Sequence, residues 1–148
     1  MEGIIFTGIQ ASGKSTFYKE RFFNTHIRIS LDLLNTRNKE NQFFEKCLAL
    51  QQRLVIDNTN PTIVDRQKYI QKLKERKFKI IGYYFHSKVE DAVERNSKRV
   101  GKAKIPNVGI YATTKKMELP TLDEGFDELY RVEIINQDFV IKDWKNEI

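Results

Sequence analysis

Residues near the start of the chain combine glycine, lysine and hydroxyl side chains at a spacing that suits phosphate binding. Residues 8–16 fill every fixed position of the Gly-x-x-x-x-Gly-Lys-Ser/Thr motif, the P-loop. Its glycines let the backbone turn tightly, so that consecutive N–H groups point at an anion. An apolar segment at 3–7 precedes the motif and a helical pattern follows it, which is the context the motif requires. The residues predicted to bind nucleotide are Gly8, Gln10, Ala11, Ser12, Gly13, Lys14, Ser15 and Thr16.

Two side chains of this loop have separate predicted tasks. Lys14 brings a compact positive charge to the β- and γ-phosphates, and Ser15 offers its hydroxyl to Mg²⁺. The N-terminus of the helix beyond Gly13 adds a favourable dipole for an anion. The sequence therefore predicts a nucleoside triphosphate and Mg²⁺ as ligands.

Two carboxylates follow predicted strands and are candidates for the chemistry itself. Asp32 follows the apolar segment 27–30, and Asp57 ends the segment 54–57. Phosphoryl transfer to a hydroxyl needs one carboxylate to orient the acceptor and take its proton, and often a second to hold hydrated Mg²⁺. The alternatives are structural: Asp32 as a helix N-cap, and Asp57 as a turn carboxylate bonded to the amides of Thr59 or Asn60.

The elements that must position these residues alternate between strand and helix along the chain. This alternation favours an α/β fold with a central, mostly parallel sheet of about five strands, helices on both faces and ligands beyond the carboxyl ends of the strands. Asn60 and Pro61 predict a helix start, with Asn60 as N-cap. The length suits one domain over 1–148. Strands are predicted at 3–7, 27–30, 54–57 and 78–85, helices at about 39–52, 88–99 and 107–117, and a closing strand or hairpin at 130–135 with 139–141.

The formal net charge of +6, from 26 basic and 20 acidic residues, favours polyanionic partners. A generic basic surface would give the same total. The charge is concentrated in one stretch beyond the middle of the chain, at Lys88, Arg95, Lys98, Arg99, Lys102 and Lys104.

Several classes of protein are disfavoured by composition. No apolar run approaches the roughly 18 residues that a membrane span requires, so no membrane association is expected. The single cysteine, Cys47, cannot form an internal disulfide, and the two histidines lie far from it in sequence, which argues against zinc. Glu2 at the second position argues against a removable signal peptide. A reducing, cytoplasmic location is expected.

Three motifs together resemble a known family. The P-loop, the run Val-Ile-Asp-Asn-Thr-Asn-Pro at 55–61 and the segment 118–126 with its Glu-Gly-Phe element are similar, in this order, to the kinase domain of polynucleotide 5′-hydroxyl kinases. The resemblance spans nearly the whole chain. Its strongest part is the Asp-Asn-Thr-Asn-Pro run, which is close to that of the animal polynucleotide kinase–phosphatase. No Asp-x-Asp-x-Thr phosphatase motif is present, so we expect kinase chemistry alone.

The resemblance implies roles for individual residues. Lys14 and Ser15 would bind ATP and Mg²⁺, and Asp32 would be the general base that activates the hydroxyl. Arg95 and Arg99 match the family's lid arginines, in a lid of about 87–104, and their spacing of four puts both on one face of a helix. An exposed basic helix face is the alternative. The residues expected to contact the acceptor are Asp32, Arg37, Asp57 and Asn60, with Asp57 also a candidate ligand of Mg²⁺.

The chain departs from the phage-type enzymes of that family at one position. These enzymes place an arginine three residues after the base to hold the acceptor phosphate, whereas this chain has Asn35. Arg37, two residues further on, is a candidate replacement.

Three functions are compatible with the sequence. The first is transfer of the γ-phosphate of ATP to the 5′-hydroxyl of an RNA or DNA end in nucleic-acid repair. The second is a small-molecule kinase of the same superfamily, acting on a sugar, nucleoside or nucleotide. The third is a nucleotide-dependent switch or binding module, although the Asn-Lys-x-Asp run of guanine recognition is missing.

Overall fold

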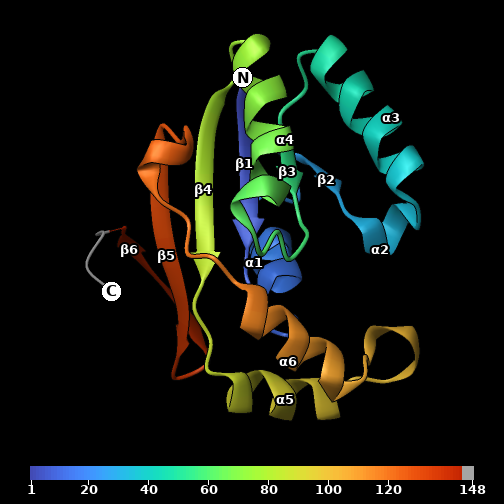
Figure 1. Cartoon of the computed structure of the whole chain (residues 1–148), viewed down its shortest axis with the longest axis vertical. Helices are drawn as coiled ribbons and strands as arrows, with labels where there is room; N and C mark the ends of the chain where they lie inside the picture. Colours follow the sequence, from blue (N-terminus) through green and yellow to red (C-terminus); the bar gives the residue numbers. More distant parts are fainter. Residues whose placement is uncertain (145–148) are drawn as a thin grey trace.

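A six-stranded sheet forms the centre of the computed structural model, which describes residues 1–144 (Figure 1). Its order is β2-β3-β1-β4-β5-β6, and all neighbours pair in parallel except β6, which is antiparallel to β5. The predicted mostly parallel sheet is confirmed. The strands are β1 (Glu2–Thr7), β2 (Ile27–Ile29), β3 (Leu54–Ile56), β4 (Lys79–Phe85), β5 (Glu128–Ile135) and β6 (Asp138–Asp143).

The sheet has six strands rather than about five because the closing segment forms a hairpin that contributes two of them. Asn136 and Gln137 turn the chain between β5 and β6, both with positive φ, at 51° and 68°. Such two-residue turns match the right-handed twist of an antiparallel pair.

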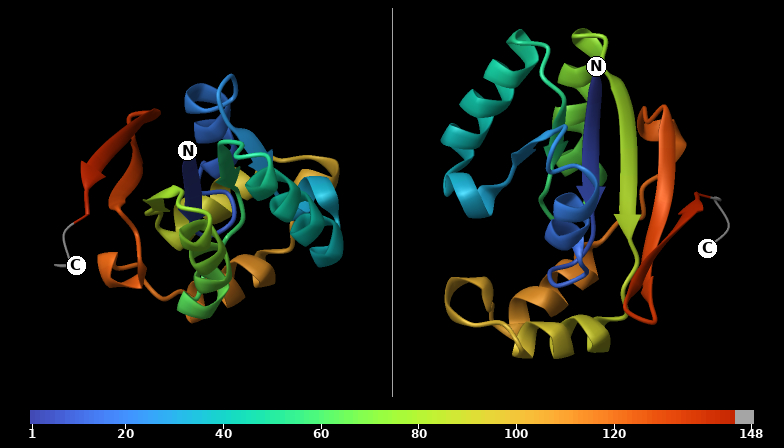
Figure 2. Two further views of the ribbon diagram at one scale, coloured as in Figure 1. Left: turned by 90° about the horizontal axis from the view of Figure 1, so that it is seen from above. Right: turned by 180° about the vertical axis from the view of Figure 1, so that it is seen from behind.

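Helices cover both faces of the sheet, as predicted, because alternate side chains of each strand point to opposite faces. Ile4 and Phe6 pack with Phe17 of α1 (Lys14–Arg21) on one face. Ile5 belongs to the core on the other face, which α3 (Arg37–Ala49) and α4 (Ile63–Glu75) cover with Phe44 and Tyr69. Figure 2 shows these layers from above and from behind.

The helix after β3 begins later than predicted, and Asn60 does not cap it. Thr62 is the N-cap of α4 and forms a capping box with Asp65. The side chain of Asn60 instead donates to the carbonyl of Phe6 at 2.8 Å, and its φ is +43°. Asn60 therefore joins the loop after β3 to the end of β1.

The helices between residues 89 and 116 lie at the carboxyl ends of the strands, near the P-loop (Figure 1). The lid predicted at about 87–104 contains α5 (Val89–Ser97) and the 3₁₀ turn η1 (Gly101–Ala103), and α6 (Asn107–Lys116) follows it. Ala92 and Ile110 pack on Ile9 and Ala11 of the P-loop. The short α2 (Leu31–Leu34) follows β2, and the 3₁₀ turn η2 (Leu122–Glu124) precedes β5. Within residues 1–144, no helix is long and apolar enough to cross a bilayer.

Candidate active site

The P-loop joins β1 to α1 and has the backbone that its glycines require. Gly13 has a φ of +99°, which a side chain disfavours, and it is the N-cap of α1. A Cβ on Gly8 would lie 2.9 Å from the Cβ of Phe85, so only glycine lets the loop pack this closely on β4. The loop thus brings the N-terminus of α1 to the carboxyl edge of the sheet.

Lys14 is buried at the start of α1 and points back along the loop. Its Nζ donates to the carbonyls of Gly8 at 3.0 Å and Ile9 at 2.8 Å. Burial lowers the pKa of Lys14 to about 8; the negative charge of Asp57 opposes this shift, and the positive charge of Arg99 adds to it. The ammonium is therefore held beside the loop's anion-binding edge, in surroundings that favour an added negative charge.

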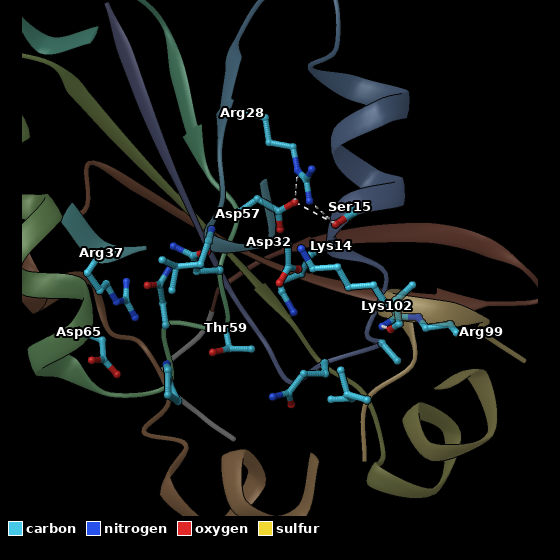
Figure 3. A pocket seen from close by; sticks show the side chains of 18 residues that line it. Lys14, Ser15, Arg28, Asp32, Arg37, Asp57, Thr59, Asp65, Arg99 and Lys102 are labelled. Carbon is cyan, nitrogen blue, oxygen red and sulfur yellow. Dashed lines mark hydrogen bonds and ion pairs between the residues drawn. The ribbon is translucent and has the colours of Figure 1, made fainter. Parts of the chain in front are cut away.

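Ser15 and Asp57 meet at the next position of the site, together with an arginine that the sequence analysis missed. Ser15 Oγ donates to Asp57 Oδ2 at 3.0 Å. Arg28, on β2, donates from Nε to the same Asp57 oxygen at 2.7 Å and from Nη2 to Ser15 Oγ at 3.0 Å. Figure 3 shows the three contacts as dashed lines. Arg28 could have been found from the sequence, because it is a charged residue between two isoleucines in the short strand 27–29.

The pair of Ser15 and Asp57 suits a magnesium ion that also binds nucleotide phosphates. Mg²⁺ prefers oxygen ligands and is commonly held through one or two carboxylates plus phosphates and water. No group of three or more His, Cys, Asp or Glu residues within the described part of the chain could hold a metal by itself. These two side chains therefore fit a metal that arrives with its nucleotide.

Asp32 lies in the first turn of α2, and its backbone is fixed from two sides. The side chain of Ser30, the N-cap, accepts from the Asp32 N–H at 3.2 Å. The preceding N–H, of Leu31, donates to Asn58 Oδ1 at 3.0 Å. Asp32 itself faces the same cavity as Lys14 and is not the N-cap.

The two lid arginines have different surroundings, because α5 ends at Ser97 and Arg99 lies beyond it. Arg95 donates to the carbonyl of Ala11 at 2.7 Å and to Ser87 Oγ at 3.2 Å. Arg99 lines the cavity and donates to the carbonyl of Ala103 at 3.4 Å. The helix predicted over 88–99 is thus shorter, and the two guanidinium groups do not share a helix face.

The lid also reaches α2 directly. Lys102 Nζ donates to Asn35 Oδ1 at 3.0 Å, a contact between residues 67 positions apart. Asn35 is the C-cap of α2, three residues after Asp32. A lid cation therefore lies beside the position where the phage-type enzymes have arginine.

A cavity of about 630 Å³ collects most of the predicted residues (Figure 3). In this view Arg37 and Asp65 lie on one side, Arg99 and Lys102 on the other, and Lys14 and Asp32 between them. Gly8, Ser12, Gly13, Thr16 and Arg95 are not among the lining residues. The predicted residues that line it are Gln10, Ala11, Lys14, Ser15, Asp32, Arg37, Asp57, Asn60 and Arg99.

Comparison with known structures identifies the architecture. The chain superposes on Kti12 from Chaetomium thermophilum, solved with ADP-AlF3, with a TM-score of 0.63, 18% identity and coverage of 88% of each chain. The chain has the P-loop kinase fold. A gluconokinase from Sinorhizobium meliloti shares this P-loop kinase fold, with a TM-score of 0.61, 17% identity and coverage of 89% of this chain and 82% of that one.

Two curated relatives confirm the resemblance stated from the motifs. A bifunctional polynucleotide phosphatase/kinase of Schizosaccharomyces pombe is 28% identical over 135 residues, which are 88% of this chain. A putative bifunctional polynucleotide phosphatase/kinase of Acanthamoeba polyphaga mimivirus is 26% identical over 138 residues, again 88% of this chain. The chain spans about a third of the length of these relatives, 33% in each case. No protein-family model matches the sequence.

Proposed function

We propose that the chain is a kinase that transfers the γ-phosphoryl group of ATP to the 5′-hydroxyl of an RNA or DNA end, a step in the repair of broken nucleic acid. The observation that carries the proposal is a single cavity lined by the P-loop residues Lys14 and Ser15, by the carboxylate Asp32, and by basic side chains of the lid and of α3. The named similarity to polynucleotide phosphatase/kinases supports the same activity.

On the donor side, Lys14 leaves the loop carbonyls and binds the β- and γ-phosphates. Ser15 and Asp57 would hold Mg²⁺, which supplies charge neutralisation on the phosphates during transfer. Arg99 enters from the lid and stabilises negative charge on the transferring group, while Arg95 supports the P-loop backbone at Ala11.

On the acceptor side, Asp32 accepts the proton of the attacking hydroxyl. The hydroxyl oxygen forms a bond to the γ-phosphorus as the bond to the β-phosphate oxygen breaks, and ADP leaves. A carboxylate in this role contributes about 10²–10⁴-fold to the rate.

The charge of the cavity supports a polyanionic acceptor. Five basic residues line it against three acidic ones, and two of these acids, Asp57 and Asp65, already accept hydrogen bonds from neighbouring side chains or backbone. The basic residues are Lys14, Arg28, Arg37, Arg99 and Lys102. Binding of a single-stranded acceptor should weaken linearly on a log–log scale with salt, with a slope of about −0.7 per phosphate contacted.

A small-molecule kinase is the second candidate. The shared fold with a gluconokinase favours it, as does the contact of Lys102 with Asn35, which connects the lid to α2 over the cavity. A neutral small acceptor would show little dependence on salt, so the salt titration separates the two candidates.

The experiment that tests the proposal is transfer of labelled γ-phosphate from ATP with Mg²⁺ to a 5′-hydroxyl oligonucleotide, beside a panel of nucleosides and sugars. The Asp32→Asn protein should lose transfer and keep ATP binding, whereas Asp138→Asn, an exposed site on β6, should match the wild type. Label on small molecules alone would contradict the nucleic-acid acceptor, and no label on any acceptor would contradict kinase activity.

A further inference from the structure

A buried glutamate beneath the acceptor side of the cavity has no role in the scheme above. Glu40, one turn after Arg37 on α3, is 0% exposed. Three donors surround its carboxylate. Asn58 Nδ2 lies 2.7 Å from Oε2, and Tyr69 OH and Arg37 Nη1 lie 2.5 Å and 3.1 Å from Oε1. A carboxylate so far from water is stabilised only by such contacts.

One oxygen of Glu40 is connected to the segment that carries Asp32. Asn58 donates to Glu40 Oε2 with its Nδ2 and accepts the Leu31 N–H with its Oδ1. A reversed amide would face the carboxylate with oxygen and the Leu31 N–H with nitrogen, so Glu40 fixes the orientation that Leu31 needs. Asp32 follows Leu31 directly and depends on that anchor for the place of its backbone.

The other oxygen holds the acceptor-side cation. Arg37 lines the cavity and is anchored through Nη1 alone, by Glu40 at 3.1 Å and Tyr69 at 3.3 Å. Among residues 1–144, its other guanidinium nitrogens have no hydrogen-bond partner, so they remain available to an anion. Figure 3 shows Arg37 and Asp32 apart from each other in the cavity, whereas Glu40 is buried and is not among the lining residues.

We propose that Glu40 is a positioning residue that sets the distance between Asp32 and Arg37, holding the first through Asn58 and the second directly. This inference rests on the proposed function, in which Asp32 is the base and Arg37 contacts the acceptor. Glu40 touches no substrate. By fixing the positions of Asp32 and Arg37, it would hold the attacking hydroxyl and the acceptor's phosphate at the correct distance from the γ-phosphate.

The chemistry of the cluster requires a carboxylate. All three partners donate, and burial together with the neighbouring Glu40 raises the pKa of Tyr69, so the phenol keeps its proton at all moderate pH values. A glutamine at position 40 would point an NH₂ group at one of these donors. The substitution keeps the shape of the side chain and removes a hydrogen bond from one of the three donors.

The kinetic test compares three variants with Glu45→Gln as control, because Glu45 lies on the same helix and pairs with Lys72 on the surface. Asn58→Ala should lower kcat and leave the KM for the acceptor unchanged, and Arg37→Met should raise that KM. Glu40→Gln should do both and lower kcat/KM for the acceptor about 100-fold, the effect of a misplacement of about 1 Å. A fluorescent ATP analogue should bind every variant as it binds the wild type.

Amide hydrogen exchange tests the positioning without any activity. Glu40→Gln and Asn58→Ala should speed exchange of the Leu31 amide at least about tenfold, and amides of α3 around Leu48 should be unaffected. Unchanged Leu31 exchange in both variants would overturn the proposal, as would faster exchange with unchanged kcat. If the wild type phosphorylates no acceptor, the proposed function fails, and the exchange rates still decide whether Glu40 holds Leu31.

Discussion

The Nε of Arg28 lies 2.7 Å from Asp57 Oδ2, and the same guanidinium reaches Ser15 Oγ at 3.0 Å. These are the two oxygens proposed above to hold Mg²⁺. A metal ion held by these oxygens would lie close to the guanidinium, and two cations repel at short distance. We therefore expect metal binding at these two oxygens to compete with Arg28.

Removal of this competing cation should tighten metal binding. We expect Arg28→Met to bind Mn²⁺ about tenfold more tightly in the absence of nucleotide, since a charge-assisted hydrogen bond to Asp57 is worth about 1.5–3 kcal/mol. Electron paramagnetic resonance of free Mn²⁺ measures this directly. Arg53→Met, an exposed arginine before β3, serves as the control. Weaker Mn²⁺ binding by Arg28→Met would mean that the arginine helps to hold the metal.

Nucleotide affinity should depend on pH through Lys14. Burial lowers the pKa of Lys14 to about 8, so the nucleotide-free protein loses this charge as the pH rises through 8. Bound phosphates favour the ammonium and raise its pKa, so ATP binding should take up protons at pH 8.5 and weaken above pH 8. Calorimetry in buffers of different ionisation enthalpy measures the uptake. Lys14→Met should bind ATP without uptake, and an equal uptake by that variant would assign the proton elsewhere.

The two lid arginines should give different kinetic defects. Arg99 lines the cavity, whereas Arg95 donates to the P-loop carbonyl of Ala11. We expect Arg99→Ala to lower kcat by about 10³-fold or more with little change in acceptor affinity, as for a transition-state arginine. Arg95→Ala should mainly raise the KM for ATP. A raised acceptor KM in Arg99→Ala would instead assign Arg99 to the acceptor side.

The buried ion pair between Arg66 and Glu124 should be a large contributor to stability. Arg66 is 0% exposed and donates to both carboxylate oxygens of Glu124, at 2.7 Å and 3.1 Å, and to the carbonyl of Asn60 at 2.9 Å. Glu124→Gln leaves a buried guanidinium without its counter-charge, and we expect it to lower the free energy of unfolding by about 3–5 kcal/mol in urea titrations.

The exposed pair of Lys98 and Glu94 provides the comparison, with its N–O distance of 3.8 Å and side chains 74% and 69% exposed. Glu94→Gln should change the free energy of unfolding by less than about 0.5 kcal/mol. If Glu124→Gln and Glu94→Gln lowered the free energy of unfolding equally, burial would not govern the strength of these ion pairs.

The sequence by itself determined the parts of this protein that depend on local pattern. The P-loop and its flanking strand and helix follow from residues adjacent in the chain, and the positions of Asp32 and Asp57 follow from where apolar strands end. Parallel strands all end at one edge of a sheet, so both carboxylates had to lie near the phosphate loop. The motif resemblance added the roles expected of them.

Tertiary structure alone decided which distant side chains meet around these carboxylates. Arg28 reaches Asp57 because β2 pairs with β3, and Glu40 reaches Asn58 because α3 packs beneath the loop after β3. The Asn-Pro pair at 60–61 predicts Asn60 as a helix N-cap. Its side chain instead donates to the carbonyl of Phe6, because β1 lies beside β3. Hydrogen bonds of this kind depend on strand order and helix packing, which the propensities of neighbouring residues do not specify.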